Sequence, residues 1–562
     1  MMHRLFGKLR LALAFFLLGV TASYAGTTGP LFNVSALGLT LTINTTPPNH
    51  YYPAAGIKIN TLGYALSTAS AQCSNANNGF CLFPVSHNAP ASIVLAGPSG
   101  TVGFTLCLNG TGPLSCQLFS LSVVAGWTWE GGSEITNVTG TYGTLGAPAS
   151  GNIPGARSGS ISWVDASGNL WLFGGTGLST SSGTGSLNDL WKYDIQTGLW
   201  TWVSGSNTKN ARGTYGTLGT PASGNIPGAR KDSISWTDAS GNLWLFGGNG
   251  LVPSGAAIAG PLNDLWKYDI QTGFWTWVGG SNTKNATGTY GTLGTPASGN
   301  IPGARSGSIS WADASGNLWL FGGNGIGSSS GSANDLNDLW KYDIQTGFWT
   351  WVGGSNTTQA NGIYGTLGTP APGNIPGARN FSISWADASG NLWLFGGNGF
   401  DSSSSFASQL NDLWKYDIQT GFWTWVGGSD TGDATSTYGT LGTPASGNIP
   451  GARNSSISWA DASGNLWLFG GLGFDSDNLL GDLNDLWKYD IQTGFWTWVG
   501  GSNLKNVPGT YGTLGTPAPS NIPGARERSI SWADTSGNLW LFGGNGYDSA
   551  SNEGFLNDLW KY

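Results

Sequence analysis

Tryptophan recurs in this chain in a fixed pattern that constrains the fold more than any other feature. The 562 residues include 30 Trp, with five in each complete repeat. The final repeat has only three before the chain ends at Tyr562, while Trp127 and Trp129 stand unmatched ahead of the first repeat. The two ends together therefore complete one repeat. We expect the termini to lie side by side in one structural unit.

Each repeat also contains four short strand signals separated by turn residues. In the third repeat they cover residues 308–311, 317–321, 339–343 and 348–352. An Arg precedes the first strand and returns every 73 to 75 residues. Its copies are Arg157, Arg230, Arg305, Arg379, Arg453 and Arg526. Such repeats, joined end to end, are typical of a β-propeller, whose closure leaves only short, protected sheet edges. The sequence predicts an all-β fold with a six-bladed β-propeller over residues 126–562, closed by strands from both termini.

The composition agrees with many short strands and tight turns. Gly occurs 93 times, and charged residues make up only 9% of the chain. Such a composition also occurs in disordered chains, but 12% aromatic and 39% hydrophobic residues supply enough apolar surface for a packed core.

The first 25 residues have the pattern of a secretory signal peptide. Arg4, Lys8 and Arg10 precede an apolar run over residues 11–20, and a small-residue cleavage pattern ends at Ala25. The run is too short to span a bilayer, and no later stretch is long and apolar enough. We expect an exported chain, in the periplasm, at the cell surface or secreted, with no transmembrane segment after cleavage. An uncleaved anchor is the alternative.

Cleavage also sets the charge of the mature chain. Without the three basic residues of the signal, 19 Lys and Arg stand against 30 Asp and Glu, a net charge of -11. Because this field repels polyanions, we expect no nucleic-acid partner.

All four cysteines precede the repeats. They are Cys73, Cys81, Cys107 and Cys116. In an exported protein they predict disulfides, and short loop lengths favour pairing in sequence order, although two other pairings exist. A zinc site is the weaker interpretation because no CxxC pair occurs. Residues 26–125 alternate apolar and polar positions, which predicts a small, disulfide-containing β-sandwich.

The repeats resemble the kelch family. The third repeat has an Arg before the inner strand at Arg305, a double glycine at Gly322 and Gly323, Tyr342 with Asp343, and then Trp349; this set returns six times. The repeats are longer than the roughly 50 residues of kelch units. A sialidase-type Asp box is the rival match, but its spacing does not fit. The resemblance implies a propeller of the galactose oxidase and kelch type, of an exported bacterial kind.

The additional length lies in loops before each repeated Arg, and we expect these loops and those after the double glycine to form a raised collar on one face. The copies differ at the pair after the Arg and in the loop after the double glycine. The pairs include Asp232, Phe381, and Glu527 with Arg528. A mixed binding surface and drift in unconstrained loops explain this variation equally well.

The six repeated Arg have two interpretations. By the resemblance, they would line the mouth of the central channel and grip carboxylates, as in kelch adaptors that bind acidic peptides. Alternatively, each guanidinium bonds backbone carbonyls and locks adjoining blades. The candidate ligand-binding set is Arg157, Arg230, Arg305, Arg379, Arg453, Arg526, Arg528, Asp232, Phe381 and Glu527.

Catalysis finds little support in the sequence. The repeats have neither His nor Cys, so the copper chemistry of kelch-type galactose oxidases is not expected, and we predict no cofactor, metal site or catalytic residue. We expect an exported, noncatalytic recognition or adhesion module that binds a protein or glycan at the loop-bearing face. A carbohydrate-active enzyme of the sialic acid epimerase or lyase kind is the alternative, and converging acid and base groups would distinguish it.

Overall fold

The computed structural model describes residues 126–562, apart from 255–257, 330, 388 and 462, together with the backbone of the strands before residue 124. The chain divides into two compact units. One is Met1–Thr128 with Thr516–Asn521, and the other is Trp129–Gly515 with Ile522–Tyr562. No helix among the described residues is long and apolar enough to cross a membrane.

The described backbone of the first unit forms nine strands in two sheets, ordered β1-β9-β8-β4-β6 and β2-β3-β7-β5. The strands are β1 (Thr21–Tyr24), β2 (Phe32–Leu37), β3 (Thr40–Thr45), β4 (Tyr51–Ile59), β5 (Ala65–Thr68), β6 (Cys81–Ser86), β7 (Ala91–Ala96), β8 (Gly100–Leu108) and β9 (Ser115–Val123). Strand β1 lies within the predicted signal peptide. The sandwich packing and the disulfides lie outside the described residues and stay predictions, although the backbone register places Cys107 opposite Cys116.

The second unit repeats one five-strand pattern. A two-residue strand begins each copy at the repeated Arg: β11 (Arg157–Ser158), β16 (Arg230–Lys231), β21 (Arg305–Ser306), β26 (Arg379–Asn380), β31 (Arg453–Asn454) and β36 (Arg526–Glu527). The inner strand follows: β12 (Ile161–Val164), β17 (Ile234–Thr237), β22 (Ile309–Ala312), β27 (Ile383–Ala386), β32 (Ile457–Ala460) and β37 (Ile530–Ala533).

Three longer strands complete each copy. The second, which carries the double glycine, is β13 (Leu170–Gly177), β18 (Leu243–Gly250), β23 (Leu318–Gly325), β28 (Leu392–Gly399), β33 (Leu466–Phe474) or β38 (Leu539–Tyr547). The third is β14 (Gly185–Asp194), β19 (Gly260–Asp269), β24 (Asn334–Asp343), β29 (Ser408–Asp417), β34 (Leu480–Asp490) or β39 (Glu553–Lys561). The outer strand is β15 (Leu199–Ser204), β20 (Phe274–Gly279), β25 (Phe348–Gly353), β30 (Phe422–Gly427), β35 (Phe495–Gly500) or β10 (Thr128–Gly131).

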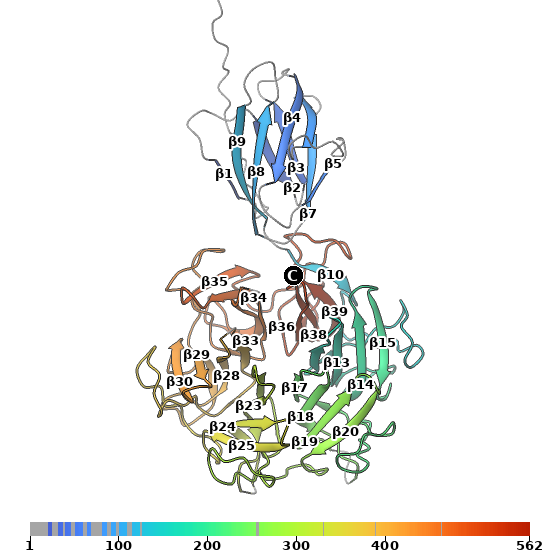
Figure 1. Cartoon of the computed structure of the whole chain (residues 1–562), viewed down its shortest axis with the longest axis vertical. Helices are drawn as coiled ribbons and strands as arrows, with labels where there is room; N and C mark the ends of the chain where they lie inside the picture. Colours follow the sequence, from blue (N-terminus) through green and yellow to red (C-terminus); the bar gives the residue numbers. More distant parts are fainter. Residues whose placement is uncertain are drawn as a thin grey trace, which may run out of the picture. The chain divides into compact units, whose positions relative to one another are not determined.

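These strands form a β-propeller. Each inner strand contacts the next, and β37 contacts β12, so the inner strands form a closed circle. Figure 1 shows the sheets arranged around a common centre. The prediction that the termini share one sheet is confirmed, because β10 is the outermost strand of the sheet ordered β10-β39-β38-β36. Hydrogen bonds from Asn137 N to Phe555 O and from Gly515 N to Trp129 O hold this junction.

The described strands of this unit do not form six separate sheets, as the sequence predicted. They form four five-stranded sheets and one ten-stranded sheet. The ten-stranded sheet contains two copies of the pattern, from β16 to β25, joined where Leu262 of β19 pairs with Arg305 of β21. This one residue pair continues the ladder from one copy into the next.

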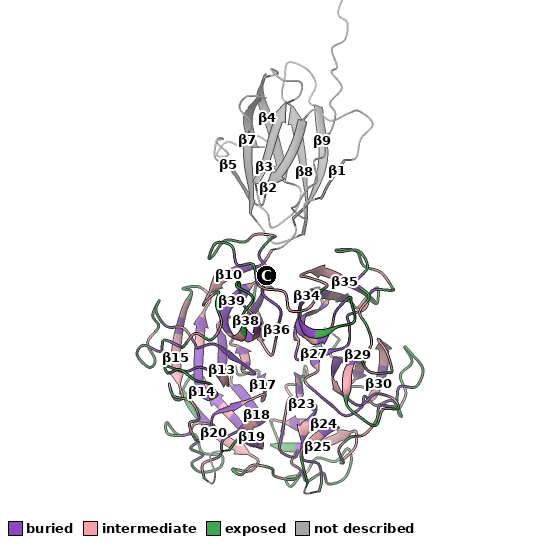
Figure 2. Ribbon diagram, turned by 180° about the vertical axis from the view of Figure 1, so that it is seen from behind, coloured by how far each residue is buried: buried purple, intermediate pink, exposed green. Residues whose placement is uncertain are grey.

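The core lies between neighbouring copies. Figure 2 shows buried residues along the strands and exposed residues mainly in the loops. In one such cluster, Trp236 and Phe246 of the second copy pack against Leu320, Trp340 and Trp349 of the third. Most Trp therefore serve packing, as their strand positions predicted.

The double glycine makes this close packing possible. Gly322 and Gly323 have φ of 64° and 97° and lie at a register shift in β23. A Cβ on Gly322 would lie 2.8 Å from the carbonyl oxygen of Arg379 in the next copy. Glycine is required here both for its backbone conformation and because the neighbouring backbone approaches so closely.

The loops before the repeated Arg do not simply form a raised collar. In the third copy, Gly294 N donates to Trp351 O and Ala297 N donates to Trp349 O. The loop therefore lies along its own outer strand and covers part of that exposed edge, which protects it from pairing with other strands.

Candidate functional site

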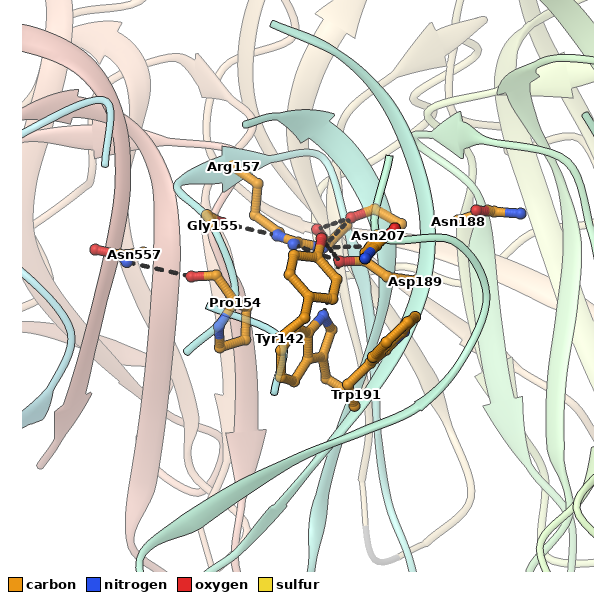
Figure 3. Close-up of polar contacts among 12 residues, drawn as sticks. Tyr142, Pro154, Gly155, Arg157, Asn188, Asp189, Trp191, Asn207 and Asn557 are labelled. Carbon is orange, nitrogen blue, oxygen red and sulfur yellow. Dashed lines mark hydrogen bonds and ion pairs between the residues drawn. The ribbon is translucent and has the colours of Figure 1, made fainter. Parts of the chain in front are cut away.

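Each repeated Arg forms a buried ion pair inside its own copy. In the first copy, Arg157 donates from both terminal nitrogens to Asp189, at 2.8 and 2.7 Å (Figure 3). Its Nε donates to Gly155 O and its Nη1 to Gly174 O. The Arg side chain is 1% exposed and that of Asp189 is fully buried. The pair thus ties the first strand to the second and third strands of one sheet.

The aspartate of this pair also accepts from two aromatic side chains. Tyr142 Oη donates to Asp189 Oδ2 at 2.6 Å, and Trp191 Nε1 donates to the same oxygen at 2.7 Å. Burial, followed by the charge of Asp189, raises the pKa of Tyr142. The tyrosine anchors its own loop and has no face available for stacking on a sugar.

The same ion pair recurs in every copy. The partners are Asp189, Asp264, Asp338, Asp412, Asp485 and Asp558. The guanidinium groups hold a blade together rather than face a ligand. The arginines therefore neither line the channel mouth nor lock adjoining blades, as the two interpretations of the sequence had it. They donate to backbone carbonyls as expected, but within one copy. The carboxylate partner was not anticipated.

A narrow channel runs along the centre of the second unit. It has a volume of about 210 Å³ and is lined by the Ser-Ile-Ser segments of the six inner strands. The second serine of each segment donates to the backbone of the preceding copy, from Ser235 Oγ to Ser162 O and finally from Ser162 Oγ to Ser531 O. These bonds close a circle, so the channel wall is polar but carries no charged side chain.

A second circle of hydrogen bonds surrounds the end of the channel. Each second residue after the repeated Arg donates its backbone N–H to its counterpart in the preceding copy. The members are Gly159, Asp232, Gly307, Phe381, Ser455 and Arg528. All six have positive φ, between 52° and 66°. Since four of them are not glycine, the circle holds strained residues, which is typical of functional sites.

Arg528 contacts both Asp232 and Phe381 across this circle, and we call these three residues the mouth cluster. The Arg528 guanidinium lies 4.2 Å from the centre of the Phe381 ring, and its Nη1 is 3.6 Å from Asp232 Oδ2. The Arg528 side chain is 28% exposed, whereas that of Asp232 is 5% exposed. Small residues alternate with these three, and a Cβ on Gly307 would lie 2.9 Å from Phe381.

Acidic side chains lie beside the mouth cluster. Glu527 Oε2 is 3.9 Å from Arg528 Nε. Burial, then the charges of Glu527 and Glu553, raises the pKa of Asp482 to about 8. Burial also raises the pKa of Glu527 and of Asp232, and Arg528 opposes both shifts. These carboxyl groups hold protons more tightly than exposed ones do.

The structure therefore brings together one part of the predicted ligand-binding set. Asp232, Phe381, Glu527 and Arg528 gather at the channel mouth, whereas the six repeated Arg lie buried in ion pairs. Sequence reasoning missed Asp482. The available signal was the position before the repeated Leu-Asn-Asp, which varies between copies. Among the described residues, no three His, Cys, Asp or Glu are placed to hold a metal ion.

A ring of sheets with this Arg, double glycine, Tyr-Asp and Trp in register resembles the kelch-type, galactose oxidase-like β-propellers. No protein-family model matches the chain, and no curated protein matches it. Solved structures with similarity to it include YjhT, at 14% identity and a TM-score of 0.40, over 74% of this chain and 95% of YjhT. A fungal alcohol oxidase of the AA5 family in complex with copper matches at 14% identity and a TM-score of 0.37, over 94% of this chain and 76% of the oxidase.

Proposed function

We propose that this protein is an exported, noncatalytic recognition or adhesion module that binds a protein or glycan ligand around the channel mouth. The supporting observation is that chemically different side chains gather at one place in a ring of near-identical copies. Asp232, Phe381 and Arg528 share one strained backbone position that is Gly or Ser in the other copies. Strained, partly exposed residues of mixed chemistry favour ligand contact over a purely structural role.

An array experiment tests this proposal. The full chain, labelled with a fluorophore, is applied to a glycan array and a protein array, and Arg528→Ala is applied in parallel. We expect wild-type binding to a defined group of ligands and at least a tenfold loss in the variant, since an Arg over an aromatic ring and beside carboxylates is a typical contact residue.

Lys209→Ala is the matched control, because it removes a partly exposed cation that donates to Ser182 O. Its binding should equal that of the wild type. No binding on either array, or equal binding by the wild type and Arg528→Ala, would reject recognition at the mouth and favour an inert structural protein.

The same proposal includes the finer organisation of the chain. We count the ten-stranded sheet as two adjacent blades, because each half repeats the complete five-strand pattern, and this gives six blades. We also keep the signal peptide over residues 1–25, the disulfide-containing domain over 26–125 and export. Mass spectrometry of the secreted chain would test cleavage after Ala25 and the pairing of Cys107 with Cys116.

A second function has one observation in its favour. Asp482 and Glu527 interact electrostatically near the channel mouth, and both have raised pKa values, as expected of an acid and base pair. This supports a carbohydrate-active enzyme of the sialic acid epimerase or lyase kind. Proton NMR of sialic acid anomers incubated with the protein tests it. Unchanged interconversion would reject the epimerase, and the absence of cleavage products would reject the lyase.

A further inference from the structure

Two of the gaps between neighbouring copies are bridged near the channel mouth by a hydrogen bond between side chains. Between the third and fourth copies, Asn380 donates to Asp335 Oδ1 at 2.5 Å, and Asn324 donates to the same oxygen at 3.0 Å. Between the fourth and fifth copies, Asn454 donates to Gln409 Oε1 at 2.7 Å. In both gaps, a side-chain amide of the next copy therefore donates a hydrogen bond to a side-chain oxygen that is largely shielded from solvent.

The gap between the fifth and sixth copies lacks both of these donors. Asp482 takes the place of Asp335, but Leu472 stands where Asn324 does and Glu527 stands where Asn380 does. Asp482 is 7% exposed, and its carboxyl group has no hydrogen-bond partner among the described residues. A mostly buried carboxyl group that lacks a donor from the protein is unfavourable unless water or a ligand supplies one.

Other charges around this gap are mainly negative. Glu553 of β39 accepts from Tyr547 Oη at 3.4 Å and interacts electrostatically with both Asp482 and Glu527. Arg528 is the nearest cation to Glu527, but its Nε has no hydrogen-bond partner and its guanidinium lies on Phe381. Asp232 and Lys231 also interact electrostatically with Glu527. Four carboxyl groups against one guanidinium and one ammonium group favour a cation rather than the anion that an arginine ring would attract.

We propose that Asp482, Glu527 and Glu553 form a site for a primary alkylammonium group, namely the end of a lysine side chain on a protein partner. This rests on the proposed recognition function, since it names the chemistry of the ligand. An ammonium group brings three N–H donors, and the carboxyl groups of Asp482 and Glu527 lack the amide donors that the other two gaps have. Because the Asp482 residue is only 7% exposed, a slim alkyl stem suits this gap better than a broad sugar ring.

Titration calorimetry on the full chain tests this site with n-butylammonium chloride as the probe. Tetramethylammonium is the comparison, because it carries the same charge but no N–H donor. We expect butylammonium to bind at least tenfold more tightly. Equal affinities, or no heat with butylammonium, would overturn the proposal.

Two variants locate the binding. Asp482→Asn and Glu527→Asn each restore an amide donor of the kind present in the other gaps, so both should fold, and circular dichroism checks this. Each should weaken butylammonium binding at least tenfold. Asp335→Asn is the matched control at the equivalent position and should bind like the wild type. Unchanged binding by both Asp482→Asn and Glu527→Asn would overturn the site.

A further pair of probes distinguishes the source of the amine. Nα-acetyl-lysine amide should compete with butylammonium, and glucosamine should compete at least tenfold more weakly. The reverse order would overturn the assignment to lysine. If the arrays find no ligand while butylammonium binds, the recognition function fails and the ammonium site stands. If an array ligand binds Asp482→Asn as tightly as the wild type, the recognition function stands and the ammonium site fails.

Discussion

Among the described residues, four of the twelve non-glycine residues with positive φ lie in the circle at the channel mouth. Asp232, Phe381, Ser455 and Arg528 have φ between 52° and 57°, a conformation that glycine adopts freely and other residues adopt at a cost of about 1–2 kcal/mol. Gly307 has the same conformation without that cost. Three of these four residues form the mouth cluster. Ser455 has the same strained backbone but does not belong to that cluster.

We predict that Ser455→Gly stabilises the protein by about 1 kcal/mol. The change relieves a φ of 57° and removes a buried hydroxyl that has no hydrogen-bond partner. Urea denaturation measures the free energy of unfolding. Gly307→Ser is the converse control and should destabilise, since its Cβ would lie 2.9 Å from Phe381. A lower stability for Ser455→Gly would contradict the prediction.

The raised pKa of Asp482 predicts how stability depends on pH. Folding raises this pKa from 3.8 to about 8, chiefly through burial and then through Glu527 and Glu553; Tyr547 also interacts with this carboxyl group. The folded protein therefore keeps a proton that the unfolded chain loses near pH 4. This contribution to stability is complete below pH 4 and is lost as the pH rises to about 8.

Asp482→Asn should remove that loss. Its gain in unfolding free energy over the wild type should grow between pH 5 and pH 8, on the order of 1.4 kcal/mol per pH unit. Urea denaturation at pH 5, 6.5 and 8 measures the difference. For Asp335→Asn we expect a smaller change, because Asn324 and Asn380 oppose the effect of burial on the pKa of Asp335. A difference for Asp482→Asn that is independent of pH would refute this account.

At the scale of the single sheet, the buried Arg-Asp pair joins strands that are distant in sequence. Arg305 of β21 donates to Asp338 of β24 at 2.6 and 2.7 Å, and Tyr290 and Trp340 donate to the same carboxylate. Four donors on one aspartate connect the loop, the first strand and the third strand. The sequence predicted a strand over residues 339–343, whereas the observed strand begins at Asn334 and includes Asp338, whose role was not predicted.

We predict that Asp338→Ala destabilises the protein by about 3–5 kcal/mol, because it leaves the buried Arg305 guanidinium without a counter charge. Thermal unfolding followed by circular dichroism measures the loss. Asp343→Ala is the control in the same strand, where a partly exposed aspartate accepts from backbone N–H groups of a turn, and it should cost about 1 kcal/mol. Similar losses in the two variants would argue against the ion pair as a structural element.

At the scale of the whole ring, closure depends on hydrogen bonds between residues about 400 positions apart. Strand β10 lies outermost against β39, and Trp532 Nε1 donates to Trp171 O across the junction of the last and first copies. The equivalent bond from Trp163 to Trp244 joins the first and second copies. The junction thus repeats the contacts that hold the other copies together.

We predict that Trp129→Ala loosens the junction selectively. Trp129 packs edge-on against Tyr511 at 5.2 Å, and its removal should cost about 2–4 kcal/mol. Hydrogen exchange should show faster exchange of β39 amides and little change in β34. Trp498→Ala, at the same position of the fifth copy, should instead affect β34. Uniform changes around the ring in both variants would contradict local closure.

The sequence by itself determined the repeat, the strands within it and the sharing of one sheet by the two termini. These follow from local periodicity and from the count of Trp, because strand alternation and turn residues act over a few neighbours. The turn aspartates are an example: Asp313 accepts from Ser315 N and Asn317 N, as its hairpin position predicted.

Only the tertiary structure decided which side chains meet. Arg305 and Asp338 are 33 positions apart, and Asp482 and Glu527 belong to different copies, so no short-range pattern relates them. These contacts depend on how the copies pack around the channel, and the role of a buried charged group depends on the groups that it contacts. For that reason the repeated arginines are structural, while the acidic gap between the fifth and sixth copies carries the proposed binding chemistry.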